Sequence, residues 1–200
     1  MTQEKEIRFK KTISDFDEIN AKDPHHEFIN GLSTAKEWIY GIRMSEMLME
    51  FHPHASELLR LASRCQHIKR WEIPREDYPM DRKGYLLWRT KLKQFHGELA
   101  GSIMKMNGYE EGDIKKVEDL LNKRRLKTDP ETQTLEDVIC LVFLKYYLDE
   151  FIEKHRDEEE KLVEIIRKTW NKMSEKGHKK ALSMSLSEKA MNIVSKALEH

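Results

Sequence analysis

Hydrophobic residues recur three or four positions apart along most of the chain, which is the spacing of amphipathic helices. The pattern predicts helices over residues 9–19, 34–51, 53–68, 85–107, 111–127, 135–151 and 157–177, and a last segment that closes the chain. The run 138–144 is almost continuously apolar, so a buried strand is the alternative there, but the long helical continuation favours a helix. We therefore expect an all-α fold of about seven or eight helices.

Local signals indicate where several of these helices begin and end. Thr34 and Glu37 have the spacing of a capping box, and Pro53 suits the first turn of the next helix. Gly108 follows the fourth helix as a stop signal, and Gly177 is expected to end the seventh.

The chain shows no internal repeat, no low-complexity segment and no linker-like composition. We therefore expect residues 1–197 to form a single helical domain. Residues 198–200 resemble the remnant of a vector-derived tail and receive no functional weight.

Charge and composition narrow the function classes. Among 200 residues, 36 Lys and Arg balance 36 Asp and Glu, which argues against a globally basic nucleic-acid binder. No apolar run reaches the roughly 18–20 residues of a membrane span, and the N-terminus lacks the apolar core of a signal peptide. Cys65 and Cys140 lie within helical patterns, which favours reduced thiols and a cytoplasmic location. The oligomeric state is not determined by these features.

Several motifs of common enzymes are missing. The chain contains no GxxxxGK[ST], GxGxxG, HExxH or GxSxG motif and no CxxC pair. These absences exclude the usual nucleotide-binding loops, zinc proteases and serine hydrolases.

The segment 64–96 is the most distinctive part of the sequence. It contains nine Lys and Arg against four acidic residues, together with five aromatic residues. Arginine offers a planar fork for phosphate or carboxylate, and aromatic rings offer stacking surfaces. Arg64 and His67 are three positions apart and can face one cleft. One interpretation is an anion pocket, for example for a nucleotide; the alternative is a solvated basic face paired with the acidic residues 149–160.

Among the nine histidines, His67 and His96 are the better candidates for chemistry because they lie at core-facing helical positions. The pairs at 25–26 and 52–54 flank prolines; they could bind a metal, but turn histidines are usually only exposed. Asp137 is the carboxylate most expected to be buried. Its alternative role is helix-terminal electrostatics together with Glu136.

Four runs carry a family resemblance: RCQHIKRWEIPREDYP at 64–79, GYLLWRTKLKQFH at 84–96, DPETQTLEDVICLVFLKYYLDEF at 129–151 and KTWNKMSEKGH at 168–178. With these runs the chain closely resembles the DUF4202 family over residues 9–186. That family name implies no activity.

The order of elements also resembles, more distantly, the HD-domain metal-dependent phosphohydrolases, which are all-helical. In that family a His, a His-Asp pair and a later Asp hold the metal. The resemblance puts Tyr40 at the first His, Gln66-His67 at the His-Asp pair and Asp137 at the final Asp, with His96 at an additional His position. Tyr and Gln are poor ligands for such metals, so the usual metal site is lost or rebuilt.

The first hypothesis is a hydrolase of phosphoesters or nucleotides on an HD-like scaffold. His67 or His96 would be the general acid/base, and Asp137 would orient it or share a divalent metal. The expected anion- and substrate-binding residues are Tyr40, Arg43, Arg64, Gln66, Arg70 and Arg89. The metal ligands are not identified.

Two alternatives remain open. The chain could be a non-catalytic binder of a nucleotide or another anion that has lost the metal site. It could also be an RNA-interacting module, which its zero net charge disfavours. A phosphate-bearing small molecule is therefore the expected partner, and neither a membrane nor a nucleic acid is expected.

Overall fold

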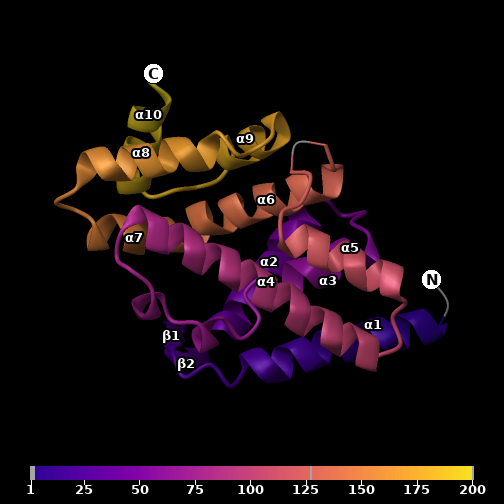
Figure 1. Ribbon diagram of the computed structural model, residues 1–200. Helices are drawn as coiled ribbons and strands as arrows, with labels where there is room; N and C mark the ends of the chain where they lie inside the picture. Colours follow the sequence, from indigo (N-terminus) through magenta and orange to yellow (C-terminus); the bar gives the residue numbers. More distant parts are fainter. Residues whose placement is uncertain (1–2, 127, 200) are drawn as a thin grey trace. The chain divides into compact units, whose positions relative to one another are not determined.

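The computed structural model describes residues 3–126 and 128–199, and in this part of the chain ten α-helices and one two-stranded sheet are present (Figure 1). The prediction of an all-α fold is confirmed. Residue contacts divide the chain into two compact units, Met1–Arg125 and Leu126–His200, which are called unit 1 and unit 2 below. The single domain expected over residues 1–197 stays a prediction. The ends of the predicted helix 111–127 and of the tail 198–200 lie outside the described residues.

Unit 1 contains five α-helices, a β-hairpin and two short 3₁₀ turns. They are α1 (Gln3–Asn20), β1 (His26–Ile29), β2 (Leu32–Ala35), α2 (Lys36–Phe51), α3 (Glu57–Arg64), η1 (Arg70–Glu72), η2 (Arg75–Asp77), α4 (Arg82–Met106) and α5 (Glu111–Leu121). The antiparallel strands are joined at Asn30-Gly31, where both residues have positive φ, as a tight two-residue hairpin turn requires.

The core of unit 1 is formed where α4 packs along α5 and where α3 packs against α1, α2 and α5 (Figure 1). Large side chains at helical spacing are fully buried here, among them Phe16, Met44, Leu59, Leu61 and Met104. The long helix α4 begins at the Asp81 side chain, which accepts a hydrogen bond from the Gly84 amide at 2.7 Å. The helix stops before Gly108, whose φ of 79° is the expected stop signal.

Two predicted helix starts in unit 1 are wrong. Thr34 lies in β2 and α2 begins at Lys36, so Thr34 and Glu37 form no capping box. The Asp23 carboxylate caps α2 instead, because its Oδ2 accepts from the Glu37 amide at 3.0 Å. Pro53 lies in a turn, and α3 begins after Ser56, whose hydroxyl accepts from the Leu59 amide.

Unit 2 contains α6 (Pro130–Val142), a π-helical segment η3 (Phe143–Tyr147), α7 (Leu148–Lys154), α8 (Glu159–Trp170), α9 (Glu175–Leu182) and α10 (Glu188–Leu198). Helix α10 packs against α8 and α7, and α6 packs against α9. The apolar run 138–144 is helical, so the strand alternative is wrong.

The predicted number of about seven or eight helices is too low, because two expected helices of unit 2 are divided. The π-helical turn η3 separates α6 from α7. The segment 171–174 separates α8 from α9, since the Ser174 hydroxyl accepts from the Gly177 amide at 3.1 Å and begins a new helix. Gly177 therefore lies inside α9 and does not end a helix. It packs so closely on Asp137 that a Cβ there would approach the carboxylate oxygen to 2.8 Å.

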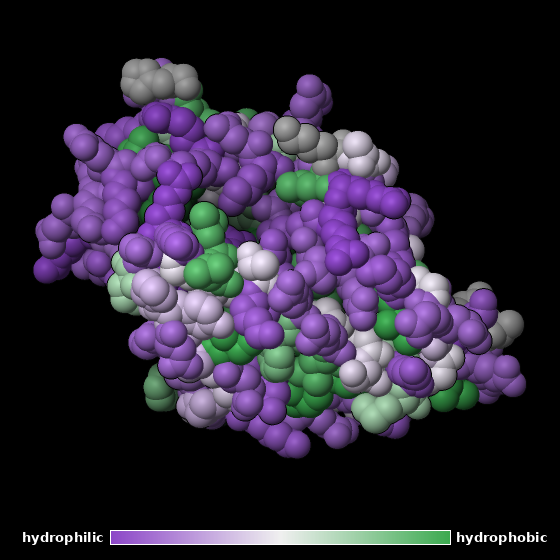
Figure 2. Space-filling view, viewed as in Figure 1, coloured by the Kyte–Doolittle hydropathy of each residue, from purple (hydrophilic) through white to green (hydrophobic). Residues whose placement is uncertain are grey.

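The face shown in Figure 2 is mainly hydrophilic, with apolar side chains in separate groups. Within the described part of the chain, no helix combines the length and the apolar character needed to cross a membrane. Cys65 and Cys140 are both buried free thiols.

Candidate functional site

A small polar cavity in unit 1 lies between the turn that follows α3 and one face of α4. Its volume is about 180 Å³. The lining residues are Gln66, His67, Arg70, Tyr85, Trp88, Arg89, Leu92, Lys93, His96 and Lys123. Those from α4 recur at the spacing of one helical face, so a single straight helix supplies six of the ten.

The turn after α3 brings Gln66 and His67 to the cavity. Lys69 has a left-handed φ of 52°, which reverses the chain direction directly after these two residues. The buried Asn20, at the end of α1, holds this turn, because its Oδ1 accepts from the Lys69 amide at 2.9 Å. The site is therefore built from the end of one helix, a strained turn and the side of another helix.

His67 is held by three neighbours. Its ring stacks on Tyr40 at 4.0 Å between centroids, with an angle of 8° between the planes. Arg70 Nη1 lies 3.2 Å from His67 Nε2, and a guanidinium can only donate, so Nε2 is the acceptor and Nδ1 carries the proton. That Nδ1–H donates to Glu37 Oε2 at 3.2 Å. Both ring nitrogens are thus engaged in a network of Glu37, His67 and Arg70.

Burial controls the protonation of this network. Desolvation raises the pKa of Glu37 to about 7, although Arg70, 3.8 Å away, acts in the opposite direction. Desolvation, followed by the cations Arg70 and Arg89, lowers the pKa of His67 well below its ordinary value. His67 is therefore neutral near neutral pH, and the carboxyl group of Glu37 is the part of the network that titrates.

His96 presents an unpaired nitrogen in the same cavity. Its Nδ1–H donates to the Ile68 carbonyl at 2.8 Å, which leaves a lone pair on Nε2. Nε2 is buried and has no hydrogen-bond partner. The side chain is 3% exposed, and desolvation lowers the pKa of His96 to about 3, so the ring stays neutral. His96 and His67 lie 6.0 Å apart between ring centroids.

A second acceptor without a partner lies beside His96. Gln66 is 6% exposed and lines the cavity, and its buried Oε1 makes no hydrogen bond. Leaving a buried acceptor unsatisfied costs on the order of 1–3 kcal/mol. Two such atoms in one cavity can accept hydrogen bonds from a molecule that carries donors.

Four cationic side chains line the same cavity as these acceptors: Arg70, Arg89, Lys93 and Lys123. The Arg70 guanidinium lies over the Trp88 ring, 4.9 Å from its centroid, and Trp88 is itself fixed by a 2.8 Å bond from Nε1 to the Ile73 carbonyl. Arg89 donates to the Tyr85 hydroxyl at 3.1 Å. Concentrated positive charge over aromatic surfaces suits a small anion.

The structure brings together five of the residues predicted from the sequence and places two arginines elsewhere. Gln66, His67, Arg70, Arg89 and His96 line the cavity, and Tyr40 supports it from behind His67. Arg43 instead pairs with Glu27 at 2.7 Å. Arg64 forms two bonds of 2.6 Å to Asp17, which join α3 to α1.

Asp137 lies in unit 2, on α6. Its carboxylate accepts from the Ser174 amide at 2.7 Å, from the Ser174 hydroxyl at 2.5 Å and from Gln133 Nε2 at 3.2 Å. Through the two contacts with Ser174, Asp137 holds the N-terminal end of α9. A role for Asp137 in orienting His67 or His96 stays a prediction.

The divalent metal implied by the HD-like resemblance does not fit the residues that the structure describes. Among these residues, no group of three or more His, Cys, Asp or Glu side chains is arranged to hold a metal ion. The two imidazoles of the cavity also lie among four cationic side chains, which repel a divalent cation.

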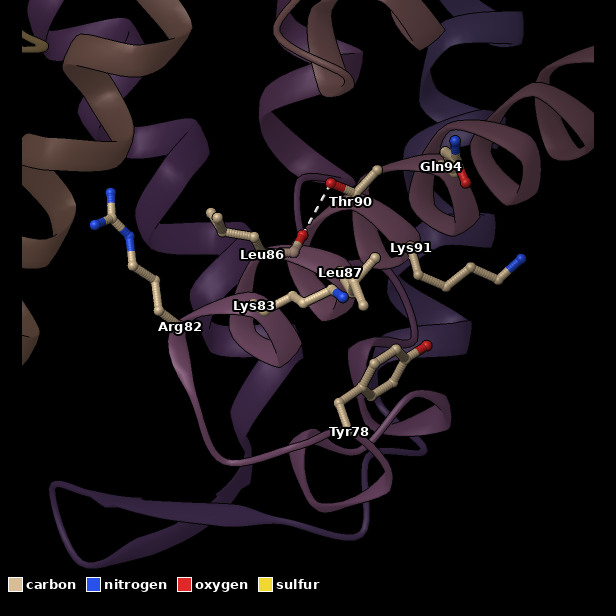
Figure 3. A pocket seen from close by; sticks show the side chains of 8 residues that line it. All are labelled: Tyr78, Arg82, Lys83, Leu86, Leu87, Thr90, Lys91 and Gln94. Atoms are coloured by element: carbon tan, nitrogen blue, oxygen red, sulfur yellow. Dashed lines mark hydrogen bonds between the residues drawn. The ribbon is translucent and has the colours of Figure 1, made fainter.

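Helix α4 borders a second, larger hollow on another face (Figure 3). This groove of about 720 Å³ is lined by Tyr78, Arg82, Lys83, Leu86, Leu87, Thr90, Lys91 and Gln94. Arg82 and Lys91 extend in opposite directions away from Leu87 at its centre. None of the buried, unpartnered polar atoms of the described residues lines this groove. The smaller cavity is therefore the stronger candidate site.

Three charged participants are not among the site residues predicted from the sequence. Glu37 stands three residues after Thr34, as in a capping box, so the sequence gives no sign that it contacts His67. Lys93 lies within the basic segment 64–96, and Lys123 lies outside it. Lys123 follows α5 and has a φ of 56°. A lysine in the left-handed region is an unusual feature, but only the fold shows it.

Unit 1 is thus a mainly helical unit with a small cationic cavity, which two neutral imidazoles line. The chain belongs to the family described as "Domain of unknown function (DUF4202)", which matches residues 10–194. This match confirms the family resemblance expected over residues 9–186. No significant match is found among curated proteins or solved structures. The distant HD-domain resemblance stays a prediction.

Proposed function

We propose that the protein binds a small phosphate-bearing molecule in the cavity of unit 1. The observation that carries this proposal is that four cationic side chains line the same cavity as a buried and a half-buried imidazole, both held neutral. Guanidinium and ammonium groups suit phosphate oxygens, and partial exclusion of bulk water from the cavity strengthens each charge interaction.

The size of the cavity limits what enters it. A volume of about 180 Å³ corresponds to roughly six water molecules at ~30 Å³ each. This suits a phosphate group with a few further atoms, so the rest of a nucleotide would lie outside. Tyr85 at the rim is 41% exposed and offers an aromatic surface for such a part.

Hydrolysis of the bound phosphoester is the second candidate function, and one observation favours it. His96 Nε2 has a free lone pair inside the cavity and could accept a proton from water. Two observations weaken it: the low pKa of His96 makes it a weak base, and His67 uses both ring nitrogens within the protein. We therefore place binding before catalysis.

A cytoplasmic location and an RNA-interacting role are two further proposals. Two buried free thiols suit a reducing compartment, so we propose a cytoplasmic location. RNA binding would require a steep decrease of affinity with salt.

Calorimetric titration and thermal unfolding with inorganic phosphate and a nucleoside monophosphate test the proposal. Ligand at 100 times its Kd should add about 2.7 kcal/mol to the free energy of unfolding. Arg89→Gln should weaken binding at least about tenfold, since it removes one charge-assisted contact. Arg82→Gln is the matched control, because Arg82 lies on the same helix but does not line the cavity.

Three outcomes are informative. If wild-type protein binds neither ligand, the proposal is wrong. If Arg89→Gln and Arg82→Gln bind equally well, the cavity is not the binding site. Release of phosphate from the nucleotide by wild-type protein, lost on substitution of His96, would move hydrolysis to the first place.

A further inference from the structure

His96 and Gln66 give the cavity a feature that a simple anion site does not need. Four cationic side chains can bind any anion of suitable size. In contrast, His96 Nε2 and Gln66 Oε1 are hydrogen-bond acceptors, and both are buried without a partner. An anion oxygen placed against them would face lone pairs, and neither atom would gain a bond.

The protonation of His96 is fixed by geometry. The Ile68 carbonyl can only accept, so the 2.8 Å contact requires the hydrogen of the neutral ring on Nδ1. Turning the ring would break this bond. Burial keeps the ring neutral as well, and His67 and Arg70 nearby act in the same direction. Nε2 can therefore act only as an acceptor.

We propose that the cavity selects an anion that itself carries a hydrogen-bond donor, with the donor directed at His96 Nε2 and the charged oxygens directed at the arginines and lysines. This inference rests on the proposed function and specifies the ligand class of the same site. Hydrogen phosphate is the simplest member, and a hydroxyl or amino group next to a phosphate is the equivalent in a larger molecule. Sulfate has a similar size and charge but no hydrogen, so it is excluded.

The test compares two pairs of anions by calorimetry at constant ionic strength. Hydrogen phosphate and sulfate are both dianions of similar size, and only the phosphate carries a hydrogen. Methylphosphonate just below neutral pH and methanesulfonate are both monoanions, and again only the first carries a hydrogen. In each pair we expect the protonated member to bind at least about tenfold more tightly, which corresponds to about 1.4 kcal/mol.

His96→Asn is the decisive variant. The asparagine amide can keep the donor to the Ile68 carbonyl, but it has no atom in the place of Nε2. The preference within each pair should fall to less than about threefold, while binding of the unprotonated member should be weakened little. Gln66→Met keeps the size of the side chain and removes Oε1, so it should reduce the preference without relying on His96. Circular dichroism of each variant checks that the fold is retained.

The results separate this inference from the proposed function. If wild-type protein binds phosphate and sulfate equally, the selectivity inference is wrong and anion binding stands. If the protonated anion is preferred and this preference persists in both His96→Asn and Gln66→Met, another group recognises the donor and the assignment to these two acceptors is wrong. If no anion binds, both proposals fail.

Discussion

Glu37 offers a direct test of the cavity network, because its carboxyl group is buried and contacts the ring of His67. It is 7% exposed, accepts from His67 Nδ1 at 3.2 Å and lies 3.8 Å from Arg70. Asp23, which caps the same helix, adds a second negative charge nearby. Glu37→Gln keeps the shape of the side chain and removes its titration.

The sign and size of the effect follow from the raised pKa. Burial raises the pKa of Glu37 from 4.5 to about 7, so the folded protein holds a proton that the unfolded chain releases. The stabilisation by this proton is complete below about 4.5 and is lost as the pH rises through about 7. The interval between the two values corresponds to about 3 kcal/mol.

We expect the free energy of unfolding of Glu37→Gln, relative to wild type, to increase by about 3 kcal/mol across this pH range. Urea unfolding at a series of pH values measures it. A Trp170→Phe background is needed because Trp170 is in unit 2, and the fluorescence of the other tryptophans then reports on unit 1 alone. The slope against urea should not change with pH if the transition is two-state.

Glu98→Gln makes the same chemical change at an exposed position of α4 and controls for the lost charge. If the stability difference between Glu37→Gln and wild type does not vary with pH, the carboxyl group of Glu37 does not titrate in the folded state as proposed. The account of a neutral His67 beside a protonatable Glu37 would then be refuted.

Three further substitutions test the scaffold. Asp17→Asn breaks a bidentate arginine pair and should lower the stability of unit 1 by about 1–3 kcal/mol in urea unfolding, while calorimetry should show unchanged phosphate binding. Gly84→Ala should lower the Tm markedly, because its Cβ would lie 2.0 Å from a backbone carbonyl oxygen. Gly112→Ala should raise the Tm slightly, because its Cβ would meet nothing within 4 Å. Equal Tm shifts for the two variants would contradict this packing. Ser174→Ala removes the cap of α9 and should lower the stability of unit 2 by about 1–2 kcal/mol. Trp170 reports on this unit through the difference in fluorescence between each protein and its Trp170→Phe form; no loss would mean that the cap is not needed.

Local sequence signals were sufficient for most helices and failed where another segment decides the helix end. The stop at Gly108 was predicted correctly because a left-handed residue after a helix is a local requirement. The start of α2 was not, because its cap is Asp23, which precedes an intervening hairpin. Gly177 looks like a helix end in the sequence, but it is needed inside α9 for close packing on Asp137. The hairpin itself was missed although Asn30-Gly31 is a strong local signal for it.

The sequence by itself determined the helical class, the family and the concentration of basic and aromatic residues between positions 64 and 96, since spacing, composition and motifs are properties of the chain alone. Only the tertiary structure decided which charges line the cavity. Arg64 and Arg70 look equivalent in the sequence, but Asp17 from another helix pairs with Arg64, whereas Arg70 lines the cavity beside His67 and Glu37. Likewise, His96 becomes an acceptor only because the Ile68 carbonyl, 28 residues away in the chain, fixes its proton. Such pairings depend on distances between segments far apart in the chain, and these distances are set by the packing of the helices.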